Sequence, residues 1–204
     1  MNERARILVV AATDGELAEP DGWATCVCGV GPVDAAAATS AAIAQHRPAA
    51  VLHVGIAGAR RARGLAAATL VIGTEARYSD LGVDAKWAPD TVAAAPLLLA
   101  AVARVLPNAP RLAIATSARV GGGDRDVEAM EGFAVLRAAQ LAGVPAIEVR
   151  AISNEVEEAD RARWRFGAAK AVIIDVTPRL VAAITRAIAP GAARPSEREE
   201  RADA

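Results

Sequence analysis

Short apolar runs alternate with longer segments of helical pattern along the chain. The apolar runs are brief and rich in branched residues, which is typical of strands buried on both faces. We expect strands at residues 6–12, 23–28, 49–54, 69–74, 111–116 and 144–152. We expect helices between them at residues 33–45, 97–106 and 132–142. This alternation predicts a single-domain α/β fold, with a central mixed, largely parallel twisted sheet flanked by helices.

The C-terminal part of the chain predicts a last helix and a tail. Asp160 is suited to cap this helix, and Pro178 is expected to break or restart it. Residues 1–188 would form the domain. Residues 189–204 are charged, contain proline and lack large apolar side chains, so we expect a disordered tail there. Residues 119–126 contain three consecutive glycines and are open to two interpretations, a mobile lid over a site and a surface loop.

Composition and charge narrow the class of protein. Lys and Arg number 23 and Asp and Glu number 24, so the formal net charge of −1 argues against an electrostatic nucleic-acid binder. No apolar run approaches the roughly 20 residues that span a bilayer, and no signal segment is recognised, so we expect a cytoplasmic protein without membrane contact. Cys26 and Cys28 would point to opposite faces of a strand, and no His/Cys cluster accompanies them. We therefore expect neither a disulfide between them nor a metal site.

Polar side chains at strand ends and helix starts are the first candidates for a ligand site. Glu16 follows the first strand in a polar turn, Glu131 begins a helix, and Ser153 and Asn154 end the last strand. Position alone also allows Glu16 and Glu131 to be ordinary first-turn acids, favoured by the helix dipole. His53 lies inside a strand, and we expect it to be a hydrogen-bonded core histidine.

Glycine-rich turns offer a second kind of site. Gly29 and Gly31 resemble part of a dinucleotide-binding fingerprint, but the third glycine is absent, and a tight strand-to-helix turn explains them equally well. Residues 55–59 are small apart from Ile56, and we expect them to form a loop at a strand end. Arg60 and Arg61 follow this stretch, which would allow an anion site there.

Several longer motifs occur in the order found in one enzyme superfamily. They are ILVVAATDGEL, GVGPVDAA, VGIAGA, EARYSDLGVDA, EAMEGFAVLRAA and EVRAISNEVEEADRARWR. On these motifs the chain resembles the purine nucleoside phosphorylase/nucleosidase superfamily, and within it the futalosine hydrolase family. EARYSD is also similar to the methylthioadenosine/S-adenosylhomocysteine nucleosidases. The resemblance implies a nucleoside phosphorylase-like fold and hydrolysis of the N-ribosidic bond of futalosine. That reaction releases hypoxanthine in menaquinone biosynthesis and needs no cofactor or metal.

The resemblance also implies roles for individual residues. Glu16 falls where nucleosidases of the superfamily carry the acid that activates water. Met130 and Glu131 match a ribose-binding pair, since a carboxylate can accept hydrogen bonds from both ribose hydroxyls. Asn154 stands where relatives acting on adenine nucleosides usually carry Asp. Its amide can donate to a 6-oxo group and accept from a protonated N7, which favours hypoxanthine as the leaving base. Ser153 would orient Asn154.

The remaining substrate-binding positions implied by the resemblance are less specific. They include Ile56, Ala57 and Gly58. Phosphorylases of the superfamily commonly place a phosphate-binding Ser where Ile56 stands, so Ile56 favours water over phosphate as the attacking group. Phe133 is expected to bind substrate, and the side chain that stacks on the base would be Phe133, Tyr78 or Trp164. The futalosine tail carries a benzoate, and the candidate cations for it are Arg60, Arg77 and Arg119.

Two other hypotheses stay open at this point. The chain could be another purine nucleosidase or phosphorylase, acting on inosine, methylthioadenosine or aminodeoxyfutalosine. It could also be a catalytically silent nucleoside-binding protein on the same scaffold. In each case the partner is a small purine nucleoside, with water in the hydrolytic case, and the resemblance implies a homodimer or larger homo-oligomer.

Overall fold

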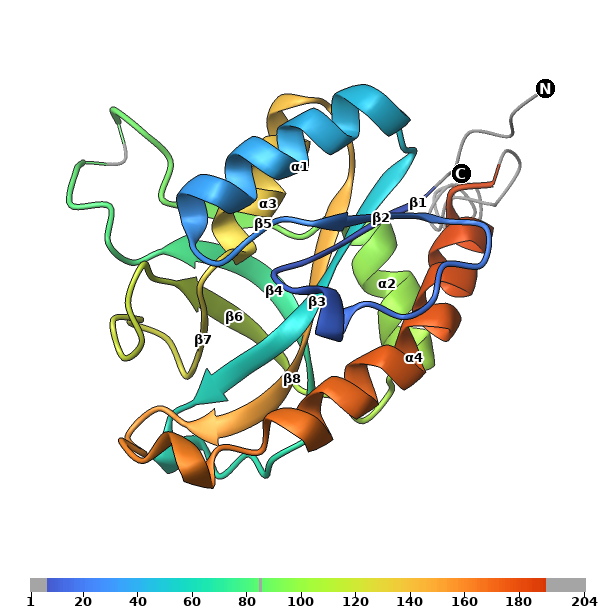
Figure 1. The fold of residues 1–204 in the computed structure, drawn as a ribbon. Helices are drawn as coiled ribbons and strands as arrows, with labels where there is room; N and C mark the ends of the chain where they lie inside the picture. The colour runs from blue at the N-terminus through green and yellow to red at the C-terminus, as the bar shows by residue number, and fades with distance from the viewer. Residues whose placement is uncertain (1–6, 85, 190–204) are drawn as a thin grey trace, which may run out of the picture.

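A computed structural model describes residues 7–84 and 86–189 (Figure 1). The strands are β1 (Ile7–Ala11), β2 (Ala24–Val27), β3 (Ala50–Ala59), β4 (Leu70–Tyr78), β5 (Thr91–Ala93), β6 (Arg111–Thr116), β7 (Val127–Ala129) and β8 (Ala146–Glu155). The α-helices are α1 (Pro32–His46), α2 (Pro96–Val105), α3 (Gly132–Leu141) and α4 (Phe166–Ala187). Short 3-10 helices are η1 (Asp14–Glu16), η2 (Arg61–Arg63) and η3 (Arg161–Arg163). Apart from residue 189, the predicted tail lies outside the described residues.

The sheet is mixed and partly closed on itself. Its order runs β2-β1-β3-β7-β6-β4-β5, and β8 pairs with both β3 and β4. The strands β3, β8, β4, β6 and β7 therefore form a ring, from which β1, β2 and β5 extend. Five pairings are parallel, and the pairings β3–β7, β4–β5 and β4–β8 are antiparallel. The predicted α/β class with a largely parallel mixed sheet is confirmed.

Helices cover two faces of the sheet, which explains the apolar runs. Ile7 and Val9 of β1 pack into a core cluster that includes side chains of α2 and α4. Leu8 and Val10 point the other way, into a cluster that includes α1 and α3. Figure 1 shows α1 and α3 together on one side and α2 and α4 on the other. Because successive side chains of a strand face opposite ways, a strand between two helix layers is apolar at every position.

Several strands run further toward their carboxyl ends than the sequence predicted. Residues 55–59, expected as a loop, continue β3, and the polar residues 75–78 continue β4. The hydrogen-bonded register with β8 carries β3 onward through a bulge between Ala57 and Gly58. The strands β5 and β7 were not predicted, because three residues are too few to show a period of two.

The prediction of a helix break at Pro178 is wrong, because α4 is continuous through this residue. Proline leaves the carbonyl four residues earlier without its usual donor. Packing compensates, since Ile173, Leu180 and Ile184 of α4 are all fully buried in the core. Asp160 caps the short helix η3 instead of α4, through a 3.0 Å hydrogen bond from the Ala162 amide.

In the part of the chain that the structure describes, no helix combines the length and apolar character needed to cross a bilayer.

Candidate active site

One cavity of about 770 Å³ opens at the carboxyl ends of β1, β3 and β8. A volume of this size is ordinary for a small-molecule site. The structure brings together at this cavity eight of the residues singled out from the sequence. They are Glu16, Ile56, Ala57, Gly58, Met130, Glu131, Ser153 and Asn154.

Glu16 is held by hydrogen bonds from three donors and is only 3% exposed. Its Oε2 accepts from the Thr13 amide at 3.0 Å and from the Thr13 hydroxyl at 2.6 Å. Its Oε1 accepts from the Ile56 amide at 3.1 Å, which ties the turn after β1 to β3. The carboxylate therefore has a fixed orientation at the cavity wall, and it is not the solvated first-turn acid that its position allowed.

Glu131 occupies the N-cap position of α3, yet its side chain makes no capping hydrogen bond. Its Oε1 accepts instead from the Gly31 amide at 3.1 Å. Gly29 and Gly31 both have positive φ, of 80° and 94°, a conformation that glycine adopts without strain. The tight turn between β2 and α1 thus brings a backbone donor to a carboxylate 100 positions later in the chain.

Arg150 connects this carboxylate to a buried polar network that the sequence analysis missed. Its Nη2 lies 3.6 Å from Glu131 Oε2, and its Nε lies 2.7 Å from Glu148 Oε1. The Val10 carbonyl, which can only accept, lies 3.0 Å from His53 Nδ1, so Nδ1 carries the proton and donates to it, and Nε2 accepts from Arg150 Nη2. The core histidine was predicted correctly, but it also supports Arg150.

The signal for this network was present in the sequence. Glu148 and Arg150 lie two apart in an otherwise apolar strand, so their side chains must share one face. Two opposite charges on one face of a buried strand are expected to pair, because an unpaired buried charge is very costly. The sequence predicted a buried strand here, but the pairing of these two charges was overlooked.

Burial and charge set the protonation of the network. Burial and the nearby Arg150 guanidinium hold the pKa of His53 well below its usual value, so the imidazole is neutral. Burial raises the pKa of Glu148, although Arg150 opposes this shift. The pKa of Arg150 is raised by Glu148 and Glu131, which outweigh the cost of its burial. Burial also raises the pKa of the Cys28 thiol to about 12.

Asn154 has its amide orientation set by two neighbours. Its Oδ1 lies 2.7 Å from the Ser153 hydroxyl, and its Nδ2 donates to the Glu155 carbonyl at 3.0 Å. Gly58 lies opposite Asn154 in the β3–β8 register, and a side chain at this position would crowd the amide. One donor hydrogen and one acceptor lone pair of Asn154 are left for a ligand.

Comparison with known proteins identifies the family to which this chain belongs. The phosphorylase superfamily pattern matches residues 22–120. The futalosine hydrolase of Streptomyces coelicolor is 34% identical to the chain, over 79% of this chain and 79% of that protein. The chain belongs to the futalosine hydrolase family. As a member of this family it is an N-glycosidase that acts on nucleosides.

Solved structures agree on the fold of this family member. The 5'-methylthioadenosine/S-adenosylhomocysteine nucleosidase of Neisseria meningitidis superposes with a TM-score of 0.74 at 21% identity, covering 88% of this chain and 97% of that chain. The futalosine hydrolase of Helicobacter pylori superposes with a TM-score of 0.72 at 16% identity, covering 91% of this chain and 99% of that one. The predicted nucleoside phosphorylase-like architecture is confirmed.

Phe133 was expected to bind substrate, but it is not among the residues that line the cavity. Its ring packs against Tyr78 at a centroid distance of 5.4 Å, inside the cluster beneath α1 and α3. The second residue of α3 therefore has its side chain in the core and not at the cavity. Of the three aromatic residues considered for stacking, Trp164 is the one on the cavity lining, together with Phe166.

Two of the three cations considered for the benzoate are held by acidic side chains. Arg77 pairs with Asp90 and Asp124, each at 2.8 Å. Arg60 lies within ion-pair distance of Glu128 and of Glu157, at 3.7 and 3.9 Å. Neither Arg60 nor Arg77 is on the cavity lining, whereas Arg119 is.

The glycine-rich connection at 119–126 is fixed to the body of this family member. Glu128, a buried residue of β7, accepts hydrogen bonds from the amides of Gly121 and Gly123. Gly123 packs so closely on Ala115 and Glu128 that a Cβ would clash with both. These contacts favour a fixed wall of the cavity over a mobile lid.

Proposed function

We propose that the protein hydrolyses the N-ribosidic bond of futalosine, releasing hypoxanthine and dehypoxanthine futalosine. The observation that carries this proposal is the convergence of Glu16, Glu131 and Asn154 on one cavity. These three side chains come from widely separated parts of the chain. Together they supply what the reaction needs: a base for water, a partner for the sugar hydroxyls and a partner for the leaving purine.

Asn154 supports a 6-oxopurine as the leaving base. Its free Nδ2 hydrogen can donate to the 6-oxo oxygen, and the free lone pair on Oδ1 can accept from N7–H. A 6-amino group would instead face Nδ2 with another hydrogen-bond donor, so that neither nitrogen would have an acceptor. Sites that hydrogen-bond one pattern reject the other strongly. Ser153 holds the amide in the orientation that suits hypoxanthine.

Glu131 supports binding of the ribose. Its Oε2 faces Arg150 and its Oε1 faces the Gly31 amide, so the carboxylate is fixed from two sides. Hydroxyl groups of the sugar can donate to its remaining lone pairs, and hydrogen bonds to a charged acceptor are among the stronger ones. Fixing the sugar also places the anomeric carbon relative to Glu16.

Glu16 supports water as the attacking group. It takes a proton from water as the water oxygen bonds to the anomeric carbon, while the bond from that carbon to the purine breaks. The bonding electrons leave with the purine, which carries a proton on N7 next to Asn154. The proton taken by Glu16 returns through solvent, which balances the one that the purine gained.

The surroundings of Ile56 favour hydrolysis over phosphorolysis. The Ile56 amide donates to Glu16, so this backbone donor is already used. Arg61 pairs with Glu155 at 2.6 Å, and Arg60 faces Glu128 and Glu157. The cations that would have suited a phosphate are therefore occupied by carboxylates of the protein.

A substrate panel tests the proposal. We expect hypoxanthine release from futalosine in buffer without phosphate, with unchanged kcat/KM when phosphate is added. Glu16→Gln keeps the shape of the side chain and removes the base, so kcat should fall by about 10²- to 10⁴-fold. Strict phosphate dependence would identify a phosphorylase, and nucleoside binding without turnover would identify a binding protein.

Assembly and location are further parts of the proposal. We expect a homodimer or larger homo-oligomer in the cytoplasm, acting in menaquinone biosynthesis, by likeness to the family. Exposed apolar side chains close to the cavity, including Val30 and Val120, support burial against a second copy. Light scattering coupled to size-exclusion chromatography measures the oligomeric state.

A further inference from the structure

One wall of the cavity supplies none of the hydrogen-bonding or proton-transfer groups assigned so far. It comes from η3 and the start of α4, and we call it the η3–α4 wall. Its side chains on the cavity lining are Arg161, Trp164, Phe166 and Lys170. The polar partners of the base, the sugar and the water come from other elements, so the cations of this wall are left for the group attached at the 5′ position of the sugar.

The aromatic half of the η3–α4 wall is well defined. The rings of Trp164 and Phe166 lie 5.3 Å apart between centroids, at an angle of 50°. The indole nitrogen of Trp164 donates to the Glu158 carbonyl at 2.9 Å, which fixes the ring. Phe166 is 37% exposed, a large fraction for an aromatic side chain next to a cavity. Two neighbouring rings of this kind can pack against a third ring supplied by a ligand.

The cationic half consists of Arg161 and Lys170. The Arg161 guanidinium lies 5.6 Å from the Trp164 ring centre. The Lys170 ammonium lies close to Gly15, beside the turn that carries Glu16. Within residues 7–84 and 86–189, neither cation has a carboxylate at ion-pair distance. Their neighbour Arg163, in contrast, pairs with Glu158 and Asp160.

Arg119, which follows β6, is a competing cation on the cavity lining. Its side chain is folded back over its own loop, because a Cβ on Gly122 would lie 2.8 Å from Arg119 Cγ and 3.1 Å from its Nε. It also has no aromatic side chain beside it on the cavity lining. Among the described lining residues, the cation–ring pair that the structure shows is Arg161 with Trp164, on the η3–α4 wall.

We infer that the η3–α4 wall recognises an aromatic, carboxylate-bearing 5′ substituent. The ring of the substituent packs against Trp164 and Phe166, and its carboxylate binds between Arg161 and Lys170. This inference rests on the proposed function, because futalosine carries a benzoate on its tail. It identifies Arg161 and Lys170 as the residues that distinguish this substrate from nucleosides with uncharged 5′ groups.

The test compares futalosine with its benzamide analogue, in which the carboxylate is replaced by an uncharged carboxamide. The wild-type protein should prefer futalosine in kcat/KM. In the double variant Arg161→Gln/Lys170→Gln, kcat/KM for futalosine should fall by about 10- to 100-fold, the loss expected for charge-assisted hydrogen bonds. For the benzamide analogue, kcat/KM should change less than about 3-fold by the same argument.

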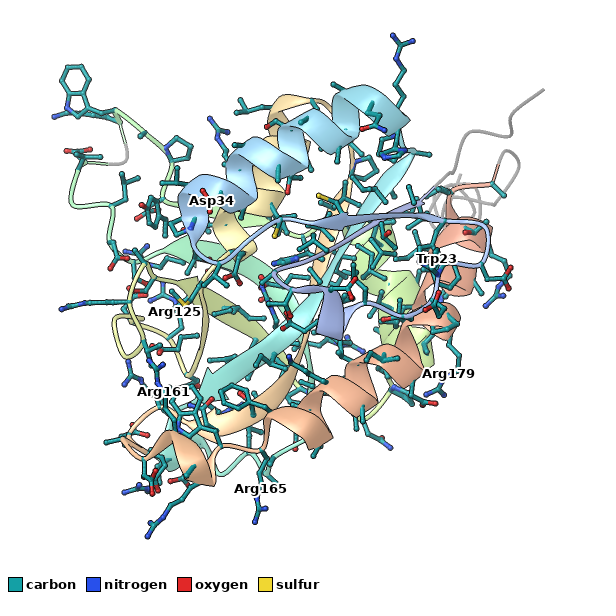
Figure 2. All side chains as sticks on the ribbon, in the orientation of Figure 1. Trp23, Asp34, Arg125, Arg161, Arg165 and Arg179 are labelled. Carbon is teal, nitrogen blue, oxygen red and sulfur yellow. The ribbon has the colours of Figure 1, made fainter. Side chains whose placement is uncertain are left out.

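Arg165→Gln is the matched control. Arg165 lies in the same segment and carries the same charge, but it is not on the cavity lining and projects outward near the start of α4 in Figure 2. This variant should leave both substrates unaffected. Arg119→Gln completes the set and should also keep the preference for the carboxylate.

The outcomes separate the inference from the proposed function. Equal losses on both substrates in the double variant, or loss of the preference in Arg119→Gln, would overturn the inference and leave a futalosine hydrolase. Equal turnover of futalosine and the benzamide analogue by the wild-type protein would also overturn the inference and leave the hydrolase activity in place. No hypoxanthine release from either substrate would overturn the proposed function, and the inference with it.

Discussion

The guanidinium of Arg150 lies between two buried carboxylates, 3.6 Å from Glu131 at the cavity and 2.7 Å from Glu148 behind it. The side chain of Arg150 is 1% exposed and that of Glu148 is fully buried. A planar guanidinium can reach both carboxylates and the Ile56 carbonyl at once, because its donors form a fork. The orientation of the proposed sugar-binding carboxylate therefore depends on a residue that is almost wholly enclosed.

Arg150→Lys tests this dependence. Lysine keeps the charge but has a single nitrogen, which cannot reach Glu131 and Glu148 together. We expect kcat/KM for futalosine to fall at least about 10-fold, since one charge-assisted hydrogen bond contributes about 1.5–3 kcal/mol. Steady-state kinetics of hypoxanthine release measures this. Arg111→Lys, at an exposed position at the start of β6, is the control. Unaltered kinetics in Arg150→Lys would show that the bridge does not position Glu131.

Gly55→Ala tests how closely Arg150 passes over β3. A Cβ on Gly55 would overlap the Arg150 guanidinium and lie 3.2 Å from Glu16 Oε1. We expect a loss of about 1–3 kcal/mol in the free energy of unfolding, the usual cost of overpacking, together with lower activity. Gly82→Ala is the matched control, because open space surrounds that position. Urea unfolding and steady-state kinetics should show a loss of stability and activity in Gly55→Ala and not in Gly82→Ala. Equal stability and activity in the two variants would contradict the close contact between Gly55 and Arg150.

Asn154→Asp should shift the preference between purines. A protonated Asp can donate to N7 and accept from a 6-amino group, whereas Asn suits the 6-oxo group. We expect the ratio of kcat/KM for aminodeoxyfutalosine to that for futalosine to rise by at least about 10-fold, as expected when one hydrogen-bond pattern replaces another. Ser153→Ala should lower both values without changing their ratio in this way. An unchanged ratio in Asn154→Asp would contradict the base-binding role.

His53 should make the protein less stable in acid. The lowered pKa keeps the folded imidazole neutral, while the unfolded imidazole takes up a proton below its ordinary value of 6.5. The unfolded state then binds more protons, so the free energy of unfolding falls with pH below about 6.5, by about 1.4 kcal/mol per pH unit at most.

His53→Gln removes this titration. Urea unfolding at about pH 7.5 and about pH 5.5 should show a smaller loss of stability in the variant than in the wild-type protein. The raised pKa of Glu148 has the opposite effect on the pH dependence. The stability contributed by a carboxyl group whose pKa is raised in the folded state is lost as pH rises. Glu148 is present in both proteins, so the difference between them reports mainly on His53. Parallel pH profiles would be inconsistent with a buried neutral histidine.

The sequence identified those site residues whose position relative to a predicted strand or helix marks them as candidates. Glu16, Glu131 and Asn154 could be found because each lies near the end of a strand or at the start of a helix, inside a longer motif. Phe133 was placed wrongly, because the direction of a side chain at a helix start depends on the helix axis. The Arg150–Glu148 pair was overlooked although its spacing of two residues was visible, whereas the contacts of Arg150 with Glu131 and His53 depend on the fold.

The fold was predictable to a similar extent. Runs of branched apolar residues located the six longer strands, and Arg111–Thr116 was predicted to the residue. The additional length of β3 depended on pairing with β8, which no local pattern reveals. The continuity of α4 through Pro178 likewise depended on the burial of the residues around it.

The ring formed by β3, β8, β4, β6 and β7 has a consequence for how the enzyme loses activity on heating. β3 carries Ile56 and β8 carries Arg150; β3 pairs with both β1 and β8, and β8 pairs with both β3 and β4. Neither strand can fray alone, since release on one side leaves it held on the other. The backbone amides around these residues should exchange with deuterium only through global unfolding, and inactivation should coincide with the main calorimetric transition.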